Sequence, residues 1–455
     1  MPDNKLIRET KSVCPECLKT IKADISEIEG KVYMVKECAR HGRFQLLLSK
    51  HPRYYRELNN FYFSLLSRSL PQRDYIVHLT NRCNLDCPIC LADSNARQTE
   101  DYPKDDLREF LKGKRNFKID LMGAEPTMRE DLPDIIRMVR RTGNIAALHT
   151  NGIKIADLAY LKELKNAGLN EVHLQFDGFD DLAYERIRGK RLLQVKLKAL
   201  ENLGKLNVST DLKATVVRGI NECQMAEILE FGVKHAFVKE IFFLGCRYLG
   251  RAKDLSMDGC IMPDELIDAL ESQTNGRISR ENILRFQKLY FVLLAALSKR
   301  KCFYVQHFLI TRNKNGYQPI NEIFNLKSIE PVLDKLKDLR PSKLSLAYLL
   351  FCLIPNLAGL KGLRQIKGLL PMFLSFIRGF DLSKLSGKNI LLGFISACDA
   401  YSFDYQVTRN CGKGAVSVEL GIQDIGALDN VIRDYKDKAI EPFVRGDNED
   451  SRTCQ

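Results

Sequence analysis

The sequence predicts an α/β protein built around a parallel sheet, preceded by a small metal-binding module and followed by a mostly helical region. Between residues 71 and 252, short apolar runs typical of strands alternate with longer segments of helical periodicity. This alternation indicates βαβ units, whose strands join one sheet in the same direction. Upstream, cysteines flank a predicted β-hairpin, and downstream most apolar runs have helical length.

The N-terminal module is predicted from its cysteine spacing. Residues 20–35 read as a hairpin with a turn at Glu29 and Gly30, and four possible metal ligands flank it. These ligands are Cys14, Cys17, Cys38 and His41. Three sulfurs and one nitrogen make a closed tetrahedral site, which usually stabilises a module too small to fold on its core alone. Zinc and a mononuclear iron both suit this set, and a module without metal is the alternative.

A second cysteine motif lies at the start of the predicted parallel sheet. Cys83, Cys87 and Cys90 have the spacing C-x3-C-x2-C, directly after a predicted strand. A closed iron–sulfur site takes four thiolates, so three thiolates leave one iron of a [4Fe–4S] cluster open to another ligand. A structural zinc site is the alternative interpretation of three closely spaced cysteines.

These motifs resemble those of radical S-adenosylmethionine (SAM) enzymes. After the three cysteines, the Gly-Ala-Glu-Pro segment that begins at Gly123 resembles the family's second-strand Gly-Gly-Glu-Pro motif, with Ala124 in place of the second glycine. The residue before the third cysteine, usually aromatic in this family, is Ile89. The ends of the later predicted strands also match the family's motifs, at the expected distances along the sequence. The resemblance implies a partial (β/α)6 barrel over residues 71–252.

The resemblance also implies a cofactor and a set of site residues. Cys83, Cys87 and Cys90 would hold a [4Fe–4S] cluster whose open iron binds SAM. The expected ligands of the methionine amino group are Gly123, Ala124, Glu125 and Pro126, because small residues allow close approach of the backbone. The residues expected near the ribose or carboxylate of SAM are Gln175, Asp177 and Arg188. For Asp177 and Gly178, a plain strand-end turn is the alternative.

The implied reaction begins with reductive cleavage of SAM. Electrons from a donor such as flavodoxin or ferredoxin would release a 5′-deoxyadenosyl radical, which abstracts hydrogen from an unactivated C–H bond. The cofactor performs the difficult step, while the protein orients it and excludes water.

The N-terminal module directly before such a core narrows the resemblance. The chain is similar to the group that contains archaeal tetraether lipid synthase and relatives described as pterin methyltransferases. This sequence lacks the cysteine-rich middle segment of that group. The remaining candidate ligands of one auxiliary iron–sulfur cluster are Cys246, Cys302, Cys398 and Cys411. Burial as small apolar side chains is the alternative, particularly for Cys246 and Cys302.

The C-terminal region carries a clue to the substrate. Residues 341–380 contain five lysines and arginines, no acidic residue, and two apolar runs at 344–360 and 368–377. Neither run is a convincing membrane span, because proline, asparagine and glycine interrupt the first. The segment is expected either to lie in the headgroup region of a membrane or to form core helices. Interfacial contact would suit a lipid-like substrate.

The composition of the chain limits the classes of partner and the cellular compartment that we expect. The chain has 455 residues, a net charge of +13 and fourteen cysteines. The positive charge favours a polyanionic partner, either an anionic membrane surface or, less favoured, nucleic acid. No secretory signal is recognised, and an oxygen-sensitive cluster suits a reducing compartment. We therefore expect the cytoplasm, with peripheral contact at the inner face of the membrane as an extension.

The sequence thus predicts four regions and one function. The regions are a metal-binding module at 1–50, a connector at 51–70, the radical SAM core at 71–252 and a helical substrate region at 253–455. The predicted function is cleavage of SAM and activation of a C–H bond of a lipid or other apolar substrate. Modification of a pterin, an RNA or a peptide is the first alternative. A non-catalytic iron–sulfur scaffold is the second.

Overall fold

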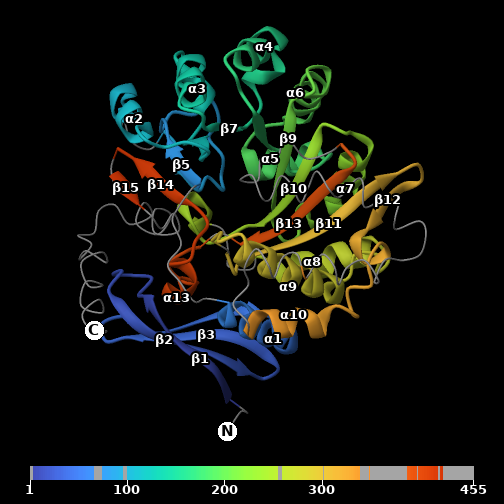
Figure 1. The fold of residues 1–455 in the computed structure, drawn as a ribbon. Coiled ribbons are helices and arrows are strands. Elements are labelled where there is room, and N and C mark those ends of the chain that lie inside the picture. The colour runs from blue at the N-terminus through green and yellow to red at the C-terminus, as the bar shows by residue number, and fades with distance from the viewer. Residues whose placement is uncertain are drawn as a thin grey trace.

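The described residues of the computed structural model form two β-sheets and confirm the predicted α/β architecture (Figure 1). These residues are 4–65, 74–95, 100–254, 259–300, 302–338, 348, 387–396, 398–418 and 421–423. A four-stranded sheet lies at the N-terminal end, below an eleven-stranded mixed sheet in the view of Figure 1. Helices pack against the strands of the larger sheet.

The N-terminal sheet is an antiparallel meander. Its strands are β1 (Asn4–Val13), β2 (Thr20–Ile28), β3 (Lys31–Cys38) and β4 (Gly42–Ser49), paired in chain order. β2 and β3 form the predicted hairpin, and its turn residues Glu29 and Gly30 have φ angles of 49° and 71°. Two positive φ angles are typical of the tight turn that matches the twist of a hairpin. Helix α1 (Pro52–Ser64) follows, within the predicted connector.

Six parallel strands follow in chain order and make up the centre of the larger sheet. They are β5 (Asp74–His78), β6 (Lys118–Met122), β7 (Ile145–Thr150), β8 (Glu171–Gln175), β9 (Ser209–Val216) and β10 (Val238–Gly245). The helices between them are α2 (Lys104–Leu111), α3 (Leu132–Arg141), α4 (Leu158–Asn166), α5 (Asp181–Arg188), α6 (Leu193–Lys205) and α7 (Met225–Lys234). Because the strands run in one direction, their carboxyl ends and the loops that follow meet at one edge.

The C-terminal region adds strands to both edges of the larger sheet. At one edge, β13 (Asn389–Ser396) pairs with β10, and β11 (Val305–Asn313) and β12 (Gly316–Pro319) lie beyond it. At the other edge, β14 (Gly414–Ser417) pairs with β5, and β15 (Gly421–Gln423) pairs with β14. These strands were not predicted from the sequence, because a short apolar run such as 389–396 reads equally as a strand or as part of a buried helix.

The same region contains the predicted helices. They are α8 (Pro263–Gln273), α9 (Arg280–Ala296), α10 (Glu330–Asp338) and the short α13 (Tyr405–Thr408). The basic apolar segment 341–380 lies outside the described residues except for Tyr348, whose side chain is exposed. Its contact with a lipid or a membrane therefore stays a prediction. Among the described residues, no helix combines the length and the apolar character needed to cross a bilayer.

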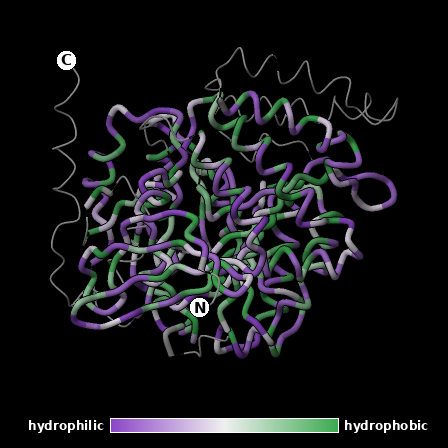
Figure 2. The backbone as a smooth tube through the Cα atoms, turned by 90° about the horizontal axis from the view of Figure 1, so that it is seen from below, coloured by the Kyte–Doolittle hydropathy of each residue, from purple (hydrophilic) through white to green (hydrophobic). Residues whose placement is uncertain are grey.

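Apolar residues at every second position of the parallel strands form the main core. Ile119 and Leu121 of β6, with Leu148 of β7, are fully buried in one cluster with helix residues such as Ile135 of α3 and Leu200 of α6. Hydrophobic stretches run through the middle of the molecule, and turns at its rim are hydrophilic (Figure 2). This burial orients the strands, because a shift of one residue would move every side chain to the other face.

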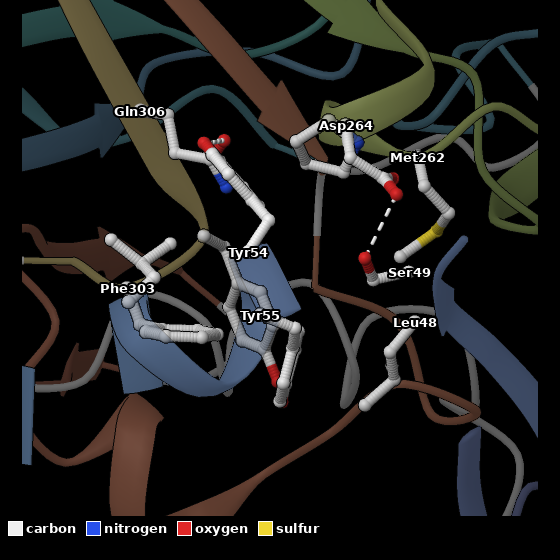
Figure 3. A pocket seen from close by; sticks show the side chains of 11 residues that line it. Leu48, Ser49, Tyr54, Tyr55, Met262, Asp264, Phe303 and Gln306 are labelled. Carbon is white, nitrogen blue, oxygen red and sulfur yellow. Dashed lines mark hydrogen bonds between the residues drawn. The ribbon is translucent and has the colours of Figure 1, made fainter. Parts of the chain in front are cut away.

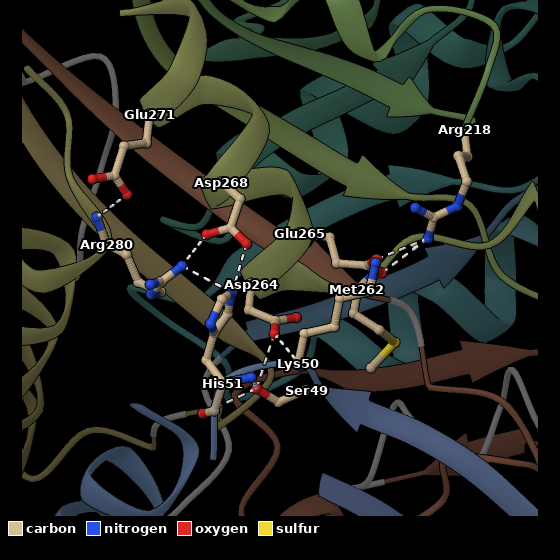
Figure 4. A network of polar contacts seen from close by, with 10 residues as sticks. All are labelled: Ser49, Lys50, His51, Arg218, Met262, Asp264, Glu265, Asp268, Glu271 and Arg280. Carbon is tan, nitrogen blue, oxygen red and sulfur yellow. Dashed lines mark hydrogen bonds and ion pairs between the residues drawn. The ribbon is translucent and has the colours of Figure 1, made fainter. Parts of the chain in front are cut away.

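A polar network connects the N-terminal sheet to α8 (Figure 4). Asp264 Oδ2, in the first turn of α8, accepts hydrogen bonds from Lys50 N at 2.7 Å and from Ser49 Oγ at 2.9 Å. The adjacent Glu265 pairs with Lys50 Nζ at 2.6 Å and with Arg218 Nη2 at 3.0 Å. Arg218 follows β9, so the network joins the end of β4, the start of α8 and the carboxyl edge of the larger sheet.

The pocket beside this network is too small for a substrate (Figure 3). It is lined by residues of β4, α1, α8 and β11, and it has room for about one water molecule. Asp264, one of the lining residues, has a buried Oδ1 without a hydrogen-bond partner. A bound water would satisfy this oxygen, so the pocket is a structural feature of the junction.

Candidate functional site

The three predicted cluster ligands lie on the loop after β5, at the carboxyl edge of the parallel strands. Cys83, Cys87 and Cys90 pack together with Leu85 in one apolar cluster. The backbone N–H groups of Leu85 and Ser94 point at the sulfurs of Cys83 and Cys90, each at 3.4 Å. Hydrogen bonds to a thiolate favour its charged form. The loop therefore presents three sulfurs with supporting donors.

Burial makes bare thiolates unfavourable at Cys83 and Cys87. It raises the pKa of Cys83 to about 11, and thiolates at Cys87 and Cys90 act in the same direction. Burial also raises the pKa of Cys87. The iron ions of a cluster would offset the mutual repulsion of buried thiolates, so the donor set fits an iron–sulfur cofactor.

The Gly-Ala-Glu-Pro segment after β6 is joined to the cysteine loop through its backbone. Ala124 N donates to Thr80 O at 2.8 Å, and Glu125 N donates to Arg82 O at 3.1 Å. Gly123 has a φ of 135°, and a Cβ there would lie 2.4 Å from Thr80 O. Only glycine allows this approach, so Gly123 sets the distance between the predicted SAM segment and the cysteine loop.

Glu125 is fully buried and connects the ends of β6 and β7. Its Oε1 accepts hydrogen bonds from Thr127 N at 3.1 Å, Thr127 Oγ1 at 2.6 Å and Thr150 Oγ1 at 2.8 Å. Its Oε2 accepts one from Asn151 N at 2.7 Å. Pro126 begins a 3₁₀ turn directly afterwards. The carboxylate thus has protein donors of its own, and its contact with SAM stays a prediction.

Asp177 and Arg188 form a buried bidentate ion pair near the cysteines. Arg188 Nε donates to Asp177 Oδ2 at 2.7 Å, and Nη2 donates to Oδ1 at 2.9 Å. Oδ1 also accepts from Thr215 N at 3.0 Å, and Oδ2 accepts from Gln175 Nε2. Arg188 lies close enough to Cys87 that its charge opposes the effect of burial on the pKa of that thiol. The structure therefore brings the three predicted residues of this group together.

Lys196 is a buried lysine of this site that the sequence analysis missed. It lies on α6, and its Nζ donates to Gln175 O at 3.0 Å and also to Gln175 Oε1 and Asn151 O. Burial lowers the pKa of Lys196 to about 7. A single lysine in an amphipathic helix gives no sequence signal, because lysines are almost always exposed. Here it joins the ends of β7 and β8 close to the cysteine loop.

The loop after β10 holds the cysteine loop from another side. Arg251 N donates to Cys90 O at 3.1 Å, and the Arg251 guanidinium pairs with Asp93 at 2.9 Å and with Asp86. Gly250 has a φ of 54°, and a Cβ there would lie 2.2 Å from Cys90 O. This close contact requires glycine and fixes the third cysteine.

The four predicted ligands of the N-terminal module meet at one point. The ligand atoms that lie within 4.8 Å of one another belong to Cys14, Cys17, Cys38 and His41. His41 Nδ1 is 3.5 Å from the sulfurs of both Cys14 and Cys38, and the sulfurs of Cys17 and Cys38 are 4.0 Å apart. These separations suit one tetrahedral ion bound through Nδ1 of the histidine.

The N-terminal sheet also holds the segment 398–411, which carries two of the C-terminal cysteines. Lys36 Nζ donates to Ala400 O at 2.6 Å, and Ser12 Oγ donates to Phe403 O at 2.6 Å. Both donors are buried, and they lie on the strands that end at the metal ligands. The metal site is therefore linked through β1 and β3 to this segment.

The four cysteines considered for an auxiliary cluster divide into two groups. Burial raises the pKa of Cys398 well above its usual value, and thiolates at Cys302 and Cys411 act in the same direction. Cys246 lies in a different apolar cluster and interacts with Cys260 instead. The structure thus gathers three of the four candidate ligands and leaves Cys246 apart.

The parallel strands carry a second set of polar residues that the sequence analysis missed. Charged and imidazole side chains alternate with the apolar core residues, and they meet on the opposite face of the strands. This set, here called the polar layer, consists of Lys118, Asp120, His149, Glu171, His173, Asp211, Lys213 and Glu240. The available signal was this alternation itself, because strands of a covered parallel sheet normally read as continuous apolar runs.

Comparison with known protein families identifies two domains of this protein. Residues 77–232 match the family model of the radical SAM superfamily, and residues 6–50 match that of the HMPTM N-terminal zinc ribbon domain. The three-cysteine loop and the Cys3His group lie within these two ranges. The chain therefore contains a radical SAM superfamily domain preceded by a zinc ribbon domain, as the sequence predicted, and these domains indicate an enzyme.

Individual relatives refine this picture. A 7,8-dihydro-6-hydroxymethylpterin dimethyltransferase of Methanocaldococcus jannaschii is 28% identical over 453 residues, covering 89% of this chain and 90% of the relative. A probable GTP 3′,8-cyclase of Pyrococcus abyssi is 30% identical over 167 residues, covering 36% of this chain and 54% of the relative. The chain thus spans about half the length of that cyclase. Among solved structures, Streptococcus suis SuiB bound to S-adenosylmethionine is 16% identical, with a TM-score of 0.38 over 50% of this chain and 49% of that chain.

Loss of one ribbon ligand is expected to remove the ribbon metal and to lower the melting temperature. Cys38→Ala should hold no metal in the ribbon, and it should melt about 5 °C lower than wild type, because a closed metal site stabilises a small module. Plasma mass spectrometry and calorimetry measure the two effects. The control Cys223→Ala, at an exposed cysteine, should match wild type in both. Wild-type metal content in Cys38→Ala would contradict the assignment of this ligand.

Proposed function

We propose that this protein cleaves SAM at a [4Fe–4S] cluster held by Cys83, Cys87 and Cys90 and activates a C–H bond of a polar ring compound of the pterin class. The observation that supports SAM cleavage is the meeting of the three cysteines, one buried and two partly buried, with the Gly-Ala-Glu-Pro segment at the carboxyl edge of the sheet. When bound, the cluster supplies the electron that divides SAM into methionine and a 5′-deoxyadenosyl radical.

The amino end of SAM is proposed to contact the backbone of Gly123 and Ala124. Glu125 supports this contact, because the four hydrogen bonds that its carboxylate accepts connect the backbone after β6 to the end of β7 and hold it in place. Pro126 then begins the 3₁₀ turn that follows this segment. The proposed role of this segment is therefore to hold the methionine end in one orientation relative to the cysteine loop.

The carboxylate of SAM is proposed to pair with Arg188. Asp177 holds the guanidinium with two hydrogen bonds, so the positive charge stays beside Cys87 without rearrangement. Gln175, which contacts both Asp177 and Lys196, is proposed to lie near the ribose. These side chains place charge and hydrogen-bond donors around SAM before it binds.

The polar layer supports a polar substrate. It lies on the strands that end at the SAM segment, and two of its side chains remain accessible: His149 at 23% and Lys213 at 21% exposure. A heterocycle with hydrogen-bond donors and acceptors can satisfy such groups, whereas an alkyl chain would remove their water without replacing it. The name of the Methanocaldococcus jannaschii relative supports the same class of compound.

A lipid-like substrate is the second candidate, favoured by the segment 341–380. Its two apolar runs would surround an acyl or isoprenoid chain, and its five basic residues would suit anionic headgroups. Peripheral contact with the inner face of a cytoplasmic membrane belongs to this candidate.

Further cofactors complete the proposal. We assign zinc to the ribbon because residues 6–50, which contain the four grouped ligands, match a zinc ribbon domain, although a mononuclear iron suits the same atoms. An auxiliary iron–sulfur cluster would use Cys302, Cys398 and Cys411, and flavodoxin or ferredoxin would supply electrons. The proposed division of the chain remains a ribbon at 1–50, a connector at 51–70, a core at 71–252 and a substrate region from 253.

Cys87→Ala is expected to abolish SAM cleavage while leaving the ribbon metal in place. Without this thiolate the cluster loses one of three protein ligands, so formation of 5′-deoxyadenosine should fall by at least about a thousandfold. The product is measured by chromatography after anaerobic reconstitution with dithionite and SAM. Cys223→Ala, assayed alongside, should cleave SAM at the wild-type rate. Cleavage at that rate by Cys87→Ala would refute the cluster assignment.

The substrate class is tested by measuring whether a candidate substrate increases the rate of SAM cleavage. With 7,8-dihydro-6-hydroxymethylpterin, 5′-deoxyadenosine formation should rise about tenfold over the uncoupled rate, because a bound acceptor consumes the radical. Mass spectrometry should show a changed pterin. Vesicles of phosphatidylglycerol, tested in parallel, should give no increase. Stimulation by the vesicles alone would favour the lipid candidate instead.

A further inference from the structure

Lys196 interrupts the apolar face of α6 that joins the main core. The next residues along this face are Ala199, Leu200 and Leu203, and all three are buried in that core. Because residues three and four positions apart share one face of a helix, the pattern predicts an apolar side chain at position 196. Burying a lysine there instead costs stability. A residue that breaks a local rule in this way is typical of a functional site.

The fully buried Lys196 ammonium uses all of its donors at the carboxyl ends of β7 and β8. It donates to Gln175 O at 3.0 Å, and also to Gln175 Oε1 and to Asn151 O. An ammonium has three N–H groups and a neutral amine has two, so three acceptors favour the ammonium. No N–H group is left for SAM. Lys196 can therefore affect SAM only through Asn151 and Gln175.

Asn151 connects Lys196 to the cysteine loop. Asn151 Nδ2 donates to Asn84 Oδ1 at 2.7 Å and lies 3.9 Å from the sulfur of Cys83. The backbone N–H of Asn151 donates to Glu125, which supports the segment proposed to hold the amino end of SAM. A shift of the Asn151 backbone would therefore disturb both the cysteine loop and that segment.

Gln175 connects Lys196 to the Asp177–Arg188 pair. Gln175 Oε1 accepts from Lys196, while Nε2 of the same amide donates to Asp177 Oδ2. An amide held at both its oxygen and its nitrogen has one orientation. Burial lowers the pKa of Lys196, whereas the Asp177 carboxylate and a thiolate at Cys87 raise it, so both groups lie close to the ammonium.

We propose that Lys196 is a positioning residue that sets the affinity for SAM by holding Asn151 and Gln175 in their binding orientations. This inference rests on the proposed binding of SAM at the cysteine loop. Without the ammonium, the Asn151 carbonyl and both oxygens of Gln175 lose a buried donor, and the Gln175 amide can turn away from Asp177. SAM would then have to order both residues itself, which costs affinity.

Binding of SAM to the oxidised enzyme tests this role without turnover. Reconstituted enzyme is equilibrated anaerobically with radiolabelled SAM and no reductant, and SAM bound per cluster is measured by equilibrium dialysis. Lys196→Met should raise the Kd for SAM about tenfold, while iron and sulfide per chain stay at wild-type values. Lys196→Gln, which keeps two of the three N–H donors, should raise the Kd about threefold and carries the test if the methionine variant does not fold.

Asn202→Ala is the matched control on the same helix. The buried Asn202 amide donates to Ile155 O at 3.2 Å and to Ala156 O at 2.8 Å, about two turns further along α6. This variant therefore also removes buried hydrogen bonds between α6 and the chain after β7, but away from the cysteine loop. Its Kd for SAM should equal that of wild type even where its melting temperature falls. An equal rise of the Kd in Asn202→Ala would overturn the specific role of Lys196.

A double-mutant cycle with Gln175→Leu tests how Lys196 acts. Because the two side chains form one unit, the Kd of the double variant should stay within about threefold of the weaker-binding single variant. A Kd raised by the product of the two single effects would contradict positioning through Gln175. A wild-type Kd in Lys196→Met or Lys196→Gln would overturn the role alone. Wild-type enzyme that binds no SAM despite a complete cluster would overturn the proposed function as well.

Discussion

The candidate site depends on one constraint: six parallel strands place their carboxyl ends at the same edge of the sheet. Residues far apart in the sequence meet there because each follows a different strand. The cysteine loop follows β5, the Gly-Ala-Glu-Pro segment follows β6, and the loop with Arg251 follows β10. Close backbone contacts at Gly123 and Gly250 then fix these loops to one another, with carbonyls too near for any Cβ.

Buried charged residues are the second feature on which the candidate site depends. Removing one partner of a buried ion pair leaves a charge without compensation, which costs about 3–5 kcal/mol. Apolar side chains of similar volume in place of such an ion pair would stabilise the fold at least as well. The Asp177–Arg188 pair and the polar layer therefore make sense as functional features: they provide fixed charges where SAM and its acceptor are proposed to lie. The apolar positions of the same strands supply the stability through the core that they form with the helices.

The features of the site that the sequence predicted best are those set by short-range residue spacing. Cys14, Cys17, Cys38 and His41 meet as expected, because a short hairpin determines their separation. The three-cysteine loop was recognised for the same reason, since its cysteines lie within a few residues. The βα series was recognised from the alternation of strand-like and helical runs.

Features set by long-range packing could not be predicted. Two of the four donors to Glu125 come from Thr150 and Asn151 at the end of β7, so its buried carboxylate was not foreseen. Cys246 belongs to another cluster than Cys302 because the C-terminal strands β11 and β13 join the sheet beyond β10. Lys196 and the polar layer depend on which face of an element turns inward, and a single sequence does not state this for a strand that is covered on both faces.

The proposed chemistry depends on an iron–sulfur cluster with one iron that the protein leaves open. Electron paramagnetic resonance of the reduced, reconstituted enzyme with and without SAM tests this most directly. If SAM binds the open iron, saturating SAM should shift the g values of the reduced cluster. A fully loaded, reducible cluster whose spectrum is the same with and without saturating SAM would contradict the account.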